Sequence, residues 1–174
     1  MKVIGKQFNS TNCIICGMQN ELGLKAPFYV LEDNRVLSEF QYTKFHQSYP
    51  ERVHGGMITC MLDEIAGRAM WATEPESLAV TTSIHVKFRR PVPYGQKLYA
   101  LAEITSFSKR GFTAKSQIFN TDGKELASAD VTYLKATAEQ ISRNTDASEM
   151  LSDINVIVPD DVKSFDLPFL DKKD

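Results

Sequence analysis

The fold of this 174-residue chain is decided by Val53-His-Gly-Gly-Met-Ile-Thr-Cys-Met-Leu-Asp-Glu-Ile-Ala-Gly-Arg-Ala-Met-Trp71. Its apolar side chains recur at spacings of three and four, which predicts a helix with a broad buried face; they are Met57, Ile58, Met61, Leu62, Ile65, Ala69 and Met70. The pair Gly55-Gly56 lets the backbone approach another molecule closely. A helix that begins there presents unpaired N–H groups and a partial positive charge, which suits an anion or an oxygen that becomes one.

Two acidic residues interrupt the apolar stretch, and their neighbours differ. Glu64 has Arg68 four positions later, and we expect the two to form an ordinary surface pair. Asp63 has no cation one turn away. At about 100° per residue it shares a stripe with small side chains and one methionine, namely Gly56, Thr59, Ala66, Gly67 and Met70. The plain interpretation is a solvated helix acid, but a carboxylate on a small-residue face, two turns below paired glycines, is a candidate functional residue.

Alternating patterns on both sides of this helix predict strands. Ala26 to Thr43 reads as a hairpin around Asp33-Asn34, and four strands follow the helix, containing Val80 to Arg89, Leu98 to Phe107, Phe112 to Asn120 and Lys124 to Leu134. In the first of these, Val80, Thr82, Ile84, Val86 and Phe88 are expected to share one face. A hairpin, a long helix and a four-strand meander predict an α+β fold, in which an antiparallel sheet wraps around a central helix.

Three motifs together resemble those of a known family. They are His54-Gly55-Gly56, Leu62-Asp63-Glu64 and the run Phe88-Arg-Arg-Pro-Val-Pro-Tyr-Gly95. With an acid nine positions after the histidine, the chain from Cys13 to Lys135 resembles the hotdog-fold thioesterases of the phenylacetic-acid-degradation (PaaI-like) type. The resemblance implies a hotdog fold that hydrolyses an acyl-CoA thioester to free acid and coenzyme A. It also implies a homodimer or a dimer of dimers (homotetramer) with active sites at the subunit interface.

Thioester hydrolysis needs an anion hole for the developing oxyanion and a carboxylate that activates water or attacks directly. We expect the Gly55 N–H, with Gly56 beside it, to form the hole, and Asp63 to act as general base or nucleophile. His54 is expected to brace the turn rather than to polarise the carbonyl. By the resemblance, the carboxylate of one subunit faces a hydroxyl on the sheet of its partner, and Thr81 stands at that position, on the polar face of its strand.

Loop and basic residues complete the candidate site. In the resembled family an amide before the histidine often helps to hold the substrate carbonyl; Ser48 stands at that position and Gln47, which we prefer, is next to it. Five bases are candidates for the phosphates of coenzyme A, because an arginine fork binds phosphate oxygens in pairs; they are Lys87, Arg89, Arg90, Lys109 and Arg110. Arg90, which precedes Pro91 at a strand end, is the preferred one.

Composition and charge narrow the function classes. The chain is 43% hydrophobic, no apolar run approaches the ~18–20 residues that span a bilayer, and its first residues lack the apolar core of a secretory signal. We therefore expect a soluble cytoplasmic protein without membrane contact. The net charge of −2 divides into +3 for residues 1–136 and −5 for residues 137–174. A mildly basic body suits a small polyanionic ligand better than nucleic acid.

Three segments are expected: an N-terminal segment (1–25), a hotdog thioesterase domain (26–136) and an acidic C-terminal extension (137–174). The first contains Cys13-Ile-Ile-Cys16-Gly17, which is half of a tetrahedral zinc site without a matching second pair, so we expect no metal. No cofactor is expected besides coenzyme A as part of the substrate. The odd number of cysteines suits a reducing compartment, and Cys60, among apolar helix residues, is expected to be inert.

The extension and the pocket give weaker signals. Ala138 to Asp153 is expected to form a weak helix, and the apolar runs at Ile154 to Val158 and Phe165 to Leu170 are expected to dock on this subunit or a neighbour. Pliable methionines are expected to line the pocket and leave the acyl group undetermined; the lining set is Met57, Met61, Met70 and Trp71.

Two other functions stay open. A non-catalytic acyl-CoA-binding protein would sense the metabolite and signal through the extension. An acyl dehydratase or hydratase on the same fold would pair a histidine with an acid on the central helix, where this chain has only Asp63 and Glu64.

Overall fold

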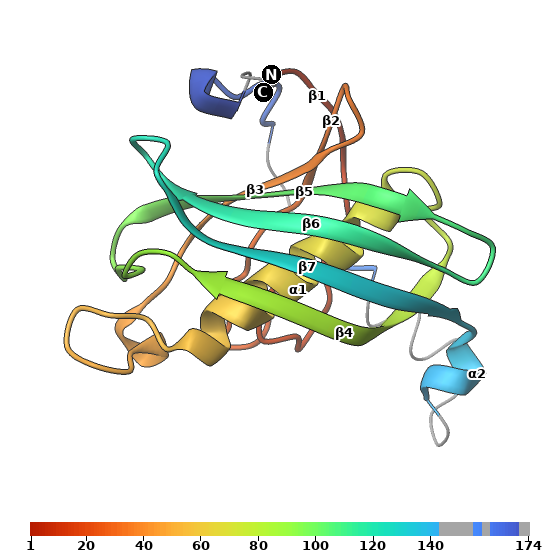
Figure 1. Ribbon diagram of the computed structural model, residues 1–174, viewed down its shortest axis with the longest axis horizontal. Coiled ribbons are helices and arrows are strands. Elements are labelled where there is room, and N and C mark those ends of the chain that lie inside the picture. Colours follow the sequence, from red (N-terminus) through yellow and green to blue (C-terminus); the bar gives the residue numbers. More distant parts are fainter. Residues whose placement is uncertain (143–154, 158–160, 171–174) are drawn as a thin grey trace.

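The computed structural model of the chain describes residues 1–142, 155–157 and 161–170. One antiparallel sheet, with the strand order β1-β2-β3-β5-β6-β7-β4, wraps around the long helix α1 (Gly55–Trp71) (Figure 1). The strands are β1 (Val3–Lys6), β2 (Tyr29–Leu31), β3 (Val36–Gln41), β4 (Leu78–Phe88), β5 (Lys97–Phe107), β6 (Gly111–Asn120) and β7 (Glu125–Ala136). This is the hotdog arrangement, so the predicted fold class is confirmed.

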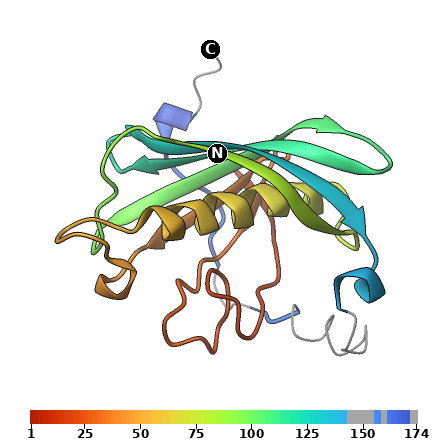
Figure 2. The same cartoon turned by 60° about the horizontal axis from the view of Figure 1, so that its bottom comes forward.

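Helix α1 packs its apolar face against the concave side of the sheet (Figure 2). Met61, Leu62 and Ile65 are fully buried there, and each side chain removed from water in this way contributes about 1.5–3 kcal/mol. The predicted spacing of the helix is therefore confirmed. None of the described helices is long and apolar enough to cross a membrane.

The order of the strands differs from the expected four-strand meander. Only β5, β6 and β7 form a meander, and β4 lies at the free edge of the sheet beside β7. The reason is where the helix ends. The turn after α1 lies next to the end of β7, where Lys135 Nζ contacts Glu74 Oε2 at 2.6 Å, so the chain enters the sheet at that edge.

A β-bulge in β4 shifts the expected alternation. Thr81 lies opposite Tyr133 and Ser83 lies opposite Thr132, so Thr82 is the extra residue between them. Ala79, Ile84 and Val86 are partly buried and pack against the core, whereas Val80 is exposed and the Thr82 hydroxyl donates to the Thr132 carbonyl. The prediction that Val80 and Thr82 share a face with Ile84 is therefore wrong, because a bulge exchanges the two faces of a strand.

The N-terminal segment covers the side of α1 that faces away from the sheet (Figure 2). Strand β1 extends the sheet beside β2, and Gln7 Nε2 then donates to the Arg68 carbonyl at 2.9 Å. Ile15 and Cys16 are buried in the main core. The helix is thus enclosed on both sides.

The described part of the C-terminal extension docks on its own chain. The short helix α2 (Ala138–Ile141) is all that is described of the helix expected to reach Asp153. Of the run from 154 to 158, only 155–157 are described, and Val156 exchanges two backbone hydrogen bonds of 2.8 Å with Asn9. Leu167 and Leu170, at the short helix η2 (Pro168–Leu170), pack on the outer face of the sheet, opposite α1. Docking of the Phe165 to Leu170 run is confirmed.

Candidate active site

Asp63 is a fixed carboxylate halfway along α1. Its Oδ1 accepts hydrogen bonds from the Thr81 hydroxyl at 2.8 Å and from the Tyr133 hydroxyl at 2.9 Å. Tyr133 also lies 2.6 Å from the Asp63 carbonyl oxygen. Among the described residues, no donor contacts Oδ2. Two donors therefore fix the orientation of the carboxylate through one oxygen and leave the other available to a water molecule or a substrate.

The bulge in β4 explains why Thr81 reaches Asp63. Without the extra residue at Thr82, Thr81 would share the outward face with Ser83, and its hydroxyl could not contact the helix. The resemblance implies a hydroxyl contributed by the partner subunit. In the structure, the Thr81 hydroxyl that contacts Asp63 belongs to the same chain.

Tyr133 was missed by the sequence reasoning. Burial, reinforced by the neighbouring Asp63 carboxylate, raises the pKa of this phenol well above its ordinary value. Tyr133 therefore keeps its proton and acts as a donor to Asp63 over the whole working pH range. The signal that could have found it is the inward alternation of β7 through Ala127, Ala129 and Val131, which ends on this tyrosine.

Asp63 borders a cavity of about 420 Å³ between α1, the start of β4 and the N-terminal segment. The cavity is lined by both polar and apolar side chains, including Asp63, Thr81, Tyr133, Met70, Trp71 and Leu78. Met70 and Trp71 were expected in the lining. Met61 was expected there as well, but it is fully buried in the core, and Met57 is also absent from the cavity lining.

The start of α1 presents one free amide. His54 is the N-cap, and its Nδ1 accepts from the Gly56 N–H at 2.9 Å. No atom of the described residues accepts from the Gly55 N–H. Gly56 is thus occupied by the bracing histidine, while Gly55 can donate to an incoming oxygen, with the helix dipole behind it.

Gly55 and Asp63 do not meet within one chain. They are eight residues apart on the same helix, which corresponds to about 12 Å along its axis. A thioester carbonyl cannot contact both groups at that separation. The predicted catalytic residues therefore form two groups in the structure. One group lies at the start of α1, around Gly55, and the other lies at the middle of α1, around Asp63.

The Gly55 group includes Gln47. Tyr94 Oη donates to Gln47 Oε1 at 3.0 Å, and no atom of the described residues accepts from the Gln47 amide nitrogen, which can therefore serve as a donor. The backbone N–H of Ser48 donates to the Arg52 carbonyl in the same loop. The exposed ring of Phe88 lies beside Gly55, 3.4 Å from where a Cβ would be.

The five predicted phosphate-binding bases divide between the two ends of β4. Lys87, Arg89 and Arg90 lie at its C-terminal end, near Gly55. Lys109 and Arg110 lie in the β5–β6 turn, at the same end of the sheet as the first residues of β4 but with β7 between them. Arg89 pairs with the Glu125 carboxylate, and Arg90 donates to the Glu125 carbonyl at 2.6 Å. Against the effect of burial, hydrogen bonds from Arg89 and Gln117 lower the pKa of Glu125.

Glu64 and Arg68 do not form the surface pair expected. Arg68 contacts Glu64 Oε1 at 2.9 Å, but its side chain is only 6% exposed. The guanidinium is stacked between Phe28 and Trp71 at 4.5 and 4.7 Å from their ring centroids. The expectation is wrong because the N-terminal segment covers this face of α1.

Cys60 is half-buried, and burial raises its pKa, in line with an unreactive thiol.

Two neighbouring threonines provide a matched test of the Asp63 contact. Thr81→Val removes one donor to the carboxylate. If Asp63 serves the thioester hydrolysis that the sequence resemblance implies, we expect kcat to fall about five- to tenfold, since a hydrogen bond to a charged group is worth about 1.5–3 kcal/mol before solvent screening. The Thr82 hydroxyl donates instead to the Thr132 carbonyl of β7, so Thr82→Val should leave kcat within about twofold. Equal effects of the two substitutions, measured by thiol release, would remove Thr81 from the site.

The sheet order and the central helix define a hotdog domain. A family model for the thioesterase superfamily matches residues 51–127, which contain α1, β4 to β6 and Asp63. This part of the chain is therefore similar to the thioesterase superfamily.

The chain is also similar in sequence to a known protein. The chain is 26% identical to acyl-coenzyme A thioesterase THEM4 of Rattus norvegicus over 110 residues, covering 63% of this chain and 46% of that protein. It thus spans about half the length of this curated relative.

Three solved structures show the fold. A thioesterase superfamily protein superposes with a TM-score of 0.65 at 24% identity, covering 70% of this chain and 59% of that one. A phenylacetic acid degradation-related protein from Ralstonia eutropha JMP134 gives 0.58 at 23%, covering 64% and 85%. The PaaI protein of E. coli gives 0.59 at 18%, covering 65% and 80%.

Proposed function

We propose that this protein is an acyl-CoA thioesterase that releases a free acid and coenzyme A. The observation that carries the proposal is the Asp63 carboxylate at the edge of a cavity. It is held through Oδ1 by Thr81 and Tyr133, and no donor from the described part of the chain contacts its Oδ2. The free Gly55 amide supplies the second requirement of acyl transfer, a donor for the oxyanion. The similarity to a protein named acyl-coenzyme A thioesterase supports the choice of substrate.

We propose further that each active site is formed by two chains. Strand β4 is an eleven-residue edge with exposed apolar side chains, and such an edge favours pairing with another strand. Phe88 is 56% exposed and Val80 is 38% exposed. An antiparallel pair of β4 strands about a two-fold axis brings the Gly55 end of one chain toward the Asp63 end of the other, which the 12 Å separation within a chain requires.

The same pairing unites the basic residues. The Arg89 and Arg90 end of one β4 strand would then lie at the same end of the paired sheets as the Lys109 and Arg110 turn of the partner chain. Four bases would then surround the mouth of each site and attract the phosphates of coenzyme A. Arg89 and Arg90 are already oriented by Glu125.

The chemistry then follows from the geometry. Water attacks the thioester carbonyl carbon while Asp63 Oδ2 takes its proton. Negative charge develops on the carbonyl oxygen, which accepts a hydrogen bond from Gly55 N–H at the positive end of α1. The C–S bond breaks as the tetrahedral intermediate collapses, and the coenzyme A thiolate leaves with the proton held by Asp63. Direct attack by Asp63 would instead form an anhydride that water cleaves.

A panel of acyl-CoA substrates tests the function. We expect thiol release with at least one small or medium acyl group, because the cavity of about 420 Å³ is at the lower end of the range for ligand pockets. Simple non-CoA thioesters of the same acids should react with a higher KM, because they lack the phosphates. Tight binding of acyl-CoA without turnover would contradict the proposal and favour the sensing function.

A further inference from the structure

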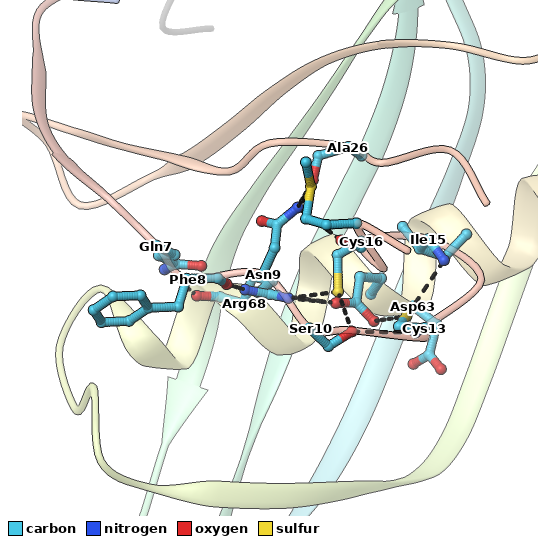
Figure 3. Close-up of polar contacts among 12 residues, drawn as sticks. Gln7, Phe8, Asn9, Ser10, Cys13, Ile15, Cys16, Ala26, Asp63 and Arg68 are labelled. Atoms are coloured by element: carbon cyan, nitrogen blue, oxygen red, sulfur yellow. Dashed lines mark hydrogen bonds and ion pairs between the residues drawn. The ribbon is translucent and has the colours of Figure 1, made fainter. Parts of the chain in front are cut away.

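A second group of reactive side chains lies at the Asp63 cavity, and the proposed hydrolysis does not use it. The N-terminal turn places Cys13 and Cys16 against α1 at Glu64 and Arg68 (Figure 3). The two sulfur atoms and a Glu64 oxygen all lie within 4.8 Å of one another. Both cysteines line the cavity that Asp63 borders.

The turn holds the two sulfurs in fixed positions. The Gly17 N–H donates to the Cys13 carbonyl at 2.8 Å and closes the turn, and a Cβ at Gly17 would lie 2.4 Å from that carbonyl oxygen. Within the turn, the Ile15 N–H donates to Cys13 Sγ at 3.3 Å. Ser10 Oγ lies 3.2 Å from Cys16 Sγ.

The two thiols differ in accessibility and in acidity. Cys13 is half-buried, whereas Cys16 is only 1% exposed. The hydrogen bond from Cys16 lowers the pKa of Cys13 to about 7. That same hydrogen bond, together with burial, raises the pKa of Cys16. An accessible thiolate beside a buried thiol is the arrangement of a nucleophilic cysteine and its resolving partner.

Arg68 disfavours the alternative use of these side chains as metal ligands. Its guanidinium contacts Cys16 Sγ at 3.0 Å and Glu64 Oε1 at 2.9 Å, so a fixed positive charge already faces two of the three prospective ligands. It cannot swing away easily, because it also donates to the Phe8 carbonyl and is stacked between two aromatic rings. A divalent ion would be placed against this charge.

We propose that Cys13 and Cys16 form a thiol–disulfide exchange site for low-molecular-weight disulfides. The Cys13 thiolate attacks one sulfur of the small disulfide, forms a mixed disulfide and releases the first small thiolate. The Cys16 thiol then attacks Cys13 Sγ, loses its proton to the second departing thiolate, and a Cys13–Cys16 disulfide results. Two protein thiols are oxidised by two electrons, and one small disulfide is reduced to two thiols.

The turn permits this closure. The hydrogen bond from Gly17 N–H to the Cys13 carbonyl closes one turn of the α-helical kind. Residues three apart in such a turn have Cα atoms about 5 Å apart, within the range of about 4.4–6.8 Å that disulfides span. Formation of the bond would draw Cys13 Sγ away from Glu64 Oε2, now 3.8 Å distant. The wall of the Asp63 cavity would therefore change shape with the redox state of the pair.

Oxidised glutathione, added to the reduced full-length protein, tests the proposal by intact mass and peptide mapping. In the wild-type protein we expect a Cys13–Cys16 disulfide and no lasting adduct. Cys16→Ser should accumulate one glutathionyl group on Cys13, because the resolving thiol is gone, and Cys13→Ser should leave Cys16 unmodified. Cys60→Ser is the control and should behave as the wild type.

The pH dependence separates an exchange site from an ordinary exposed thiol. Alkylation of Cys13 by iodoacetamide should rise with pH and level off above a midpoint near pH 7, because the thiolate forms there. Alkylation of Cys60 should keep rising above pH 9. Identical pH profiles for the alkylation of Cys13 and Cys60 would overturn the proposal. It would also be overturned if the Cys16→Ser variant carried glutathione on Cys60 and none on Cys13. So would stoichiometric zinc, bound on incubation with the metal alone and lost in Cys13→Ser.

Discussion

Asp63→Asn is expected to lower kcat for acyl-CoA hydrolysis by about 10²–10⁴-fold, the usual contribution of a positioned general base. The amide can still accept hydrogen bonds from Thr81 and Tyr133 through its oxygen, so the side chain should keep its place. It cannot take a proton from water or attack a carbonyl. KM should change little, because the groups proposed to bind coenzyme A are untouched.

The loss of kcat is measured by thiol release under saturating substrate. Thermal melting of each variant shows whether the fold is kept. Asp130→Asn is the matched control: Asp130 is an exposed acid on β7 remote from the cavity lining, and its variant should retain full activity. Asp63→Ala should be at least as inactive as Asp63→Asn. Wild-type kcat in both Asp63 variants with unchanged melting would remove Asp63 from the mechanism.

Gly55→Pro should produce the second large loss, about 10²–10³-fold in kcat, because it removes the one amide proposed to bind the oxyanion. Proline is well tolerated at this position, the first of a helix, where the N–H has no partner within the helix. The preceding residue, His54, has φ −63° and ψ 135°, which is the conformation that a following proline requires.

Gly55→Ala is the control, since it adds a Cβ and keeps the N–H. That Cβ would lie 3.4 Å from the Phe88 ring, whose exposed side chain can move aside. We expect Gly55→Ala to retain kcat within a few fold. If both variants lose activity equally, crowding at the glycine rather than loss of the amide explains the effect.

Periodicity predicted the helix and most strands well, because both depend on neighbouring residues. The helix from Gly55 to Trp71 follows from apolar spacing, and the β2–β3 hairpin follows from alternation around Asp33-Asn34. The strand order could not be obtained in this way. The place of β4 beside β7 is set by the exit of the chain from α1, which is a feature of the tertiary structure.

In the candidate site, too, the residues with a local signal could be predicted, and those that depend on tertiary contacts could not. Asp63 and Gly55 stood out through local composition. Tyr133 did not, because it reaches Asp63 from 70 residues further along the chain. The bulge at Thr82 has no glycine or proline to mark it, and the burial of Arg68 depends on an N-terminal segment whose packing the sequence pattern did not reveal.

The central claim is that Asp63 of one chain and the Gly55 amide of another act on the same thioester. Mixing Asp63→Asn with Gly55→Pro chains under conditions of subunit exchange tests it most directly. Each mixed dimer would contain one site with both defects and one with neither, so random mixing should restore about a quarter of wild-type kcat per chain. Activity no higher than that of the two separate variants, with exchange verified by mass, would contradict the claim.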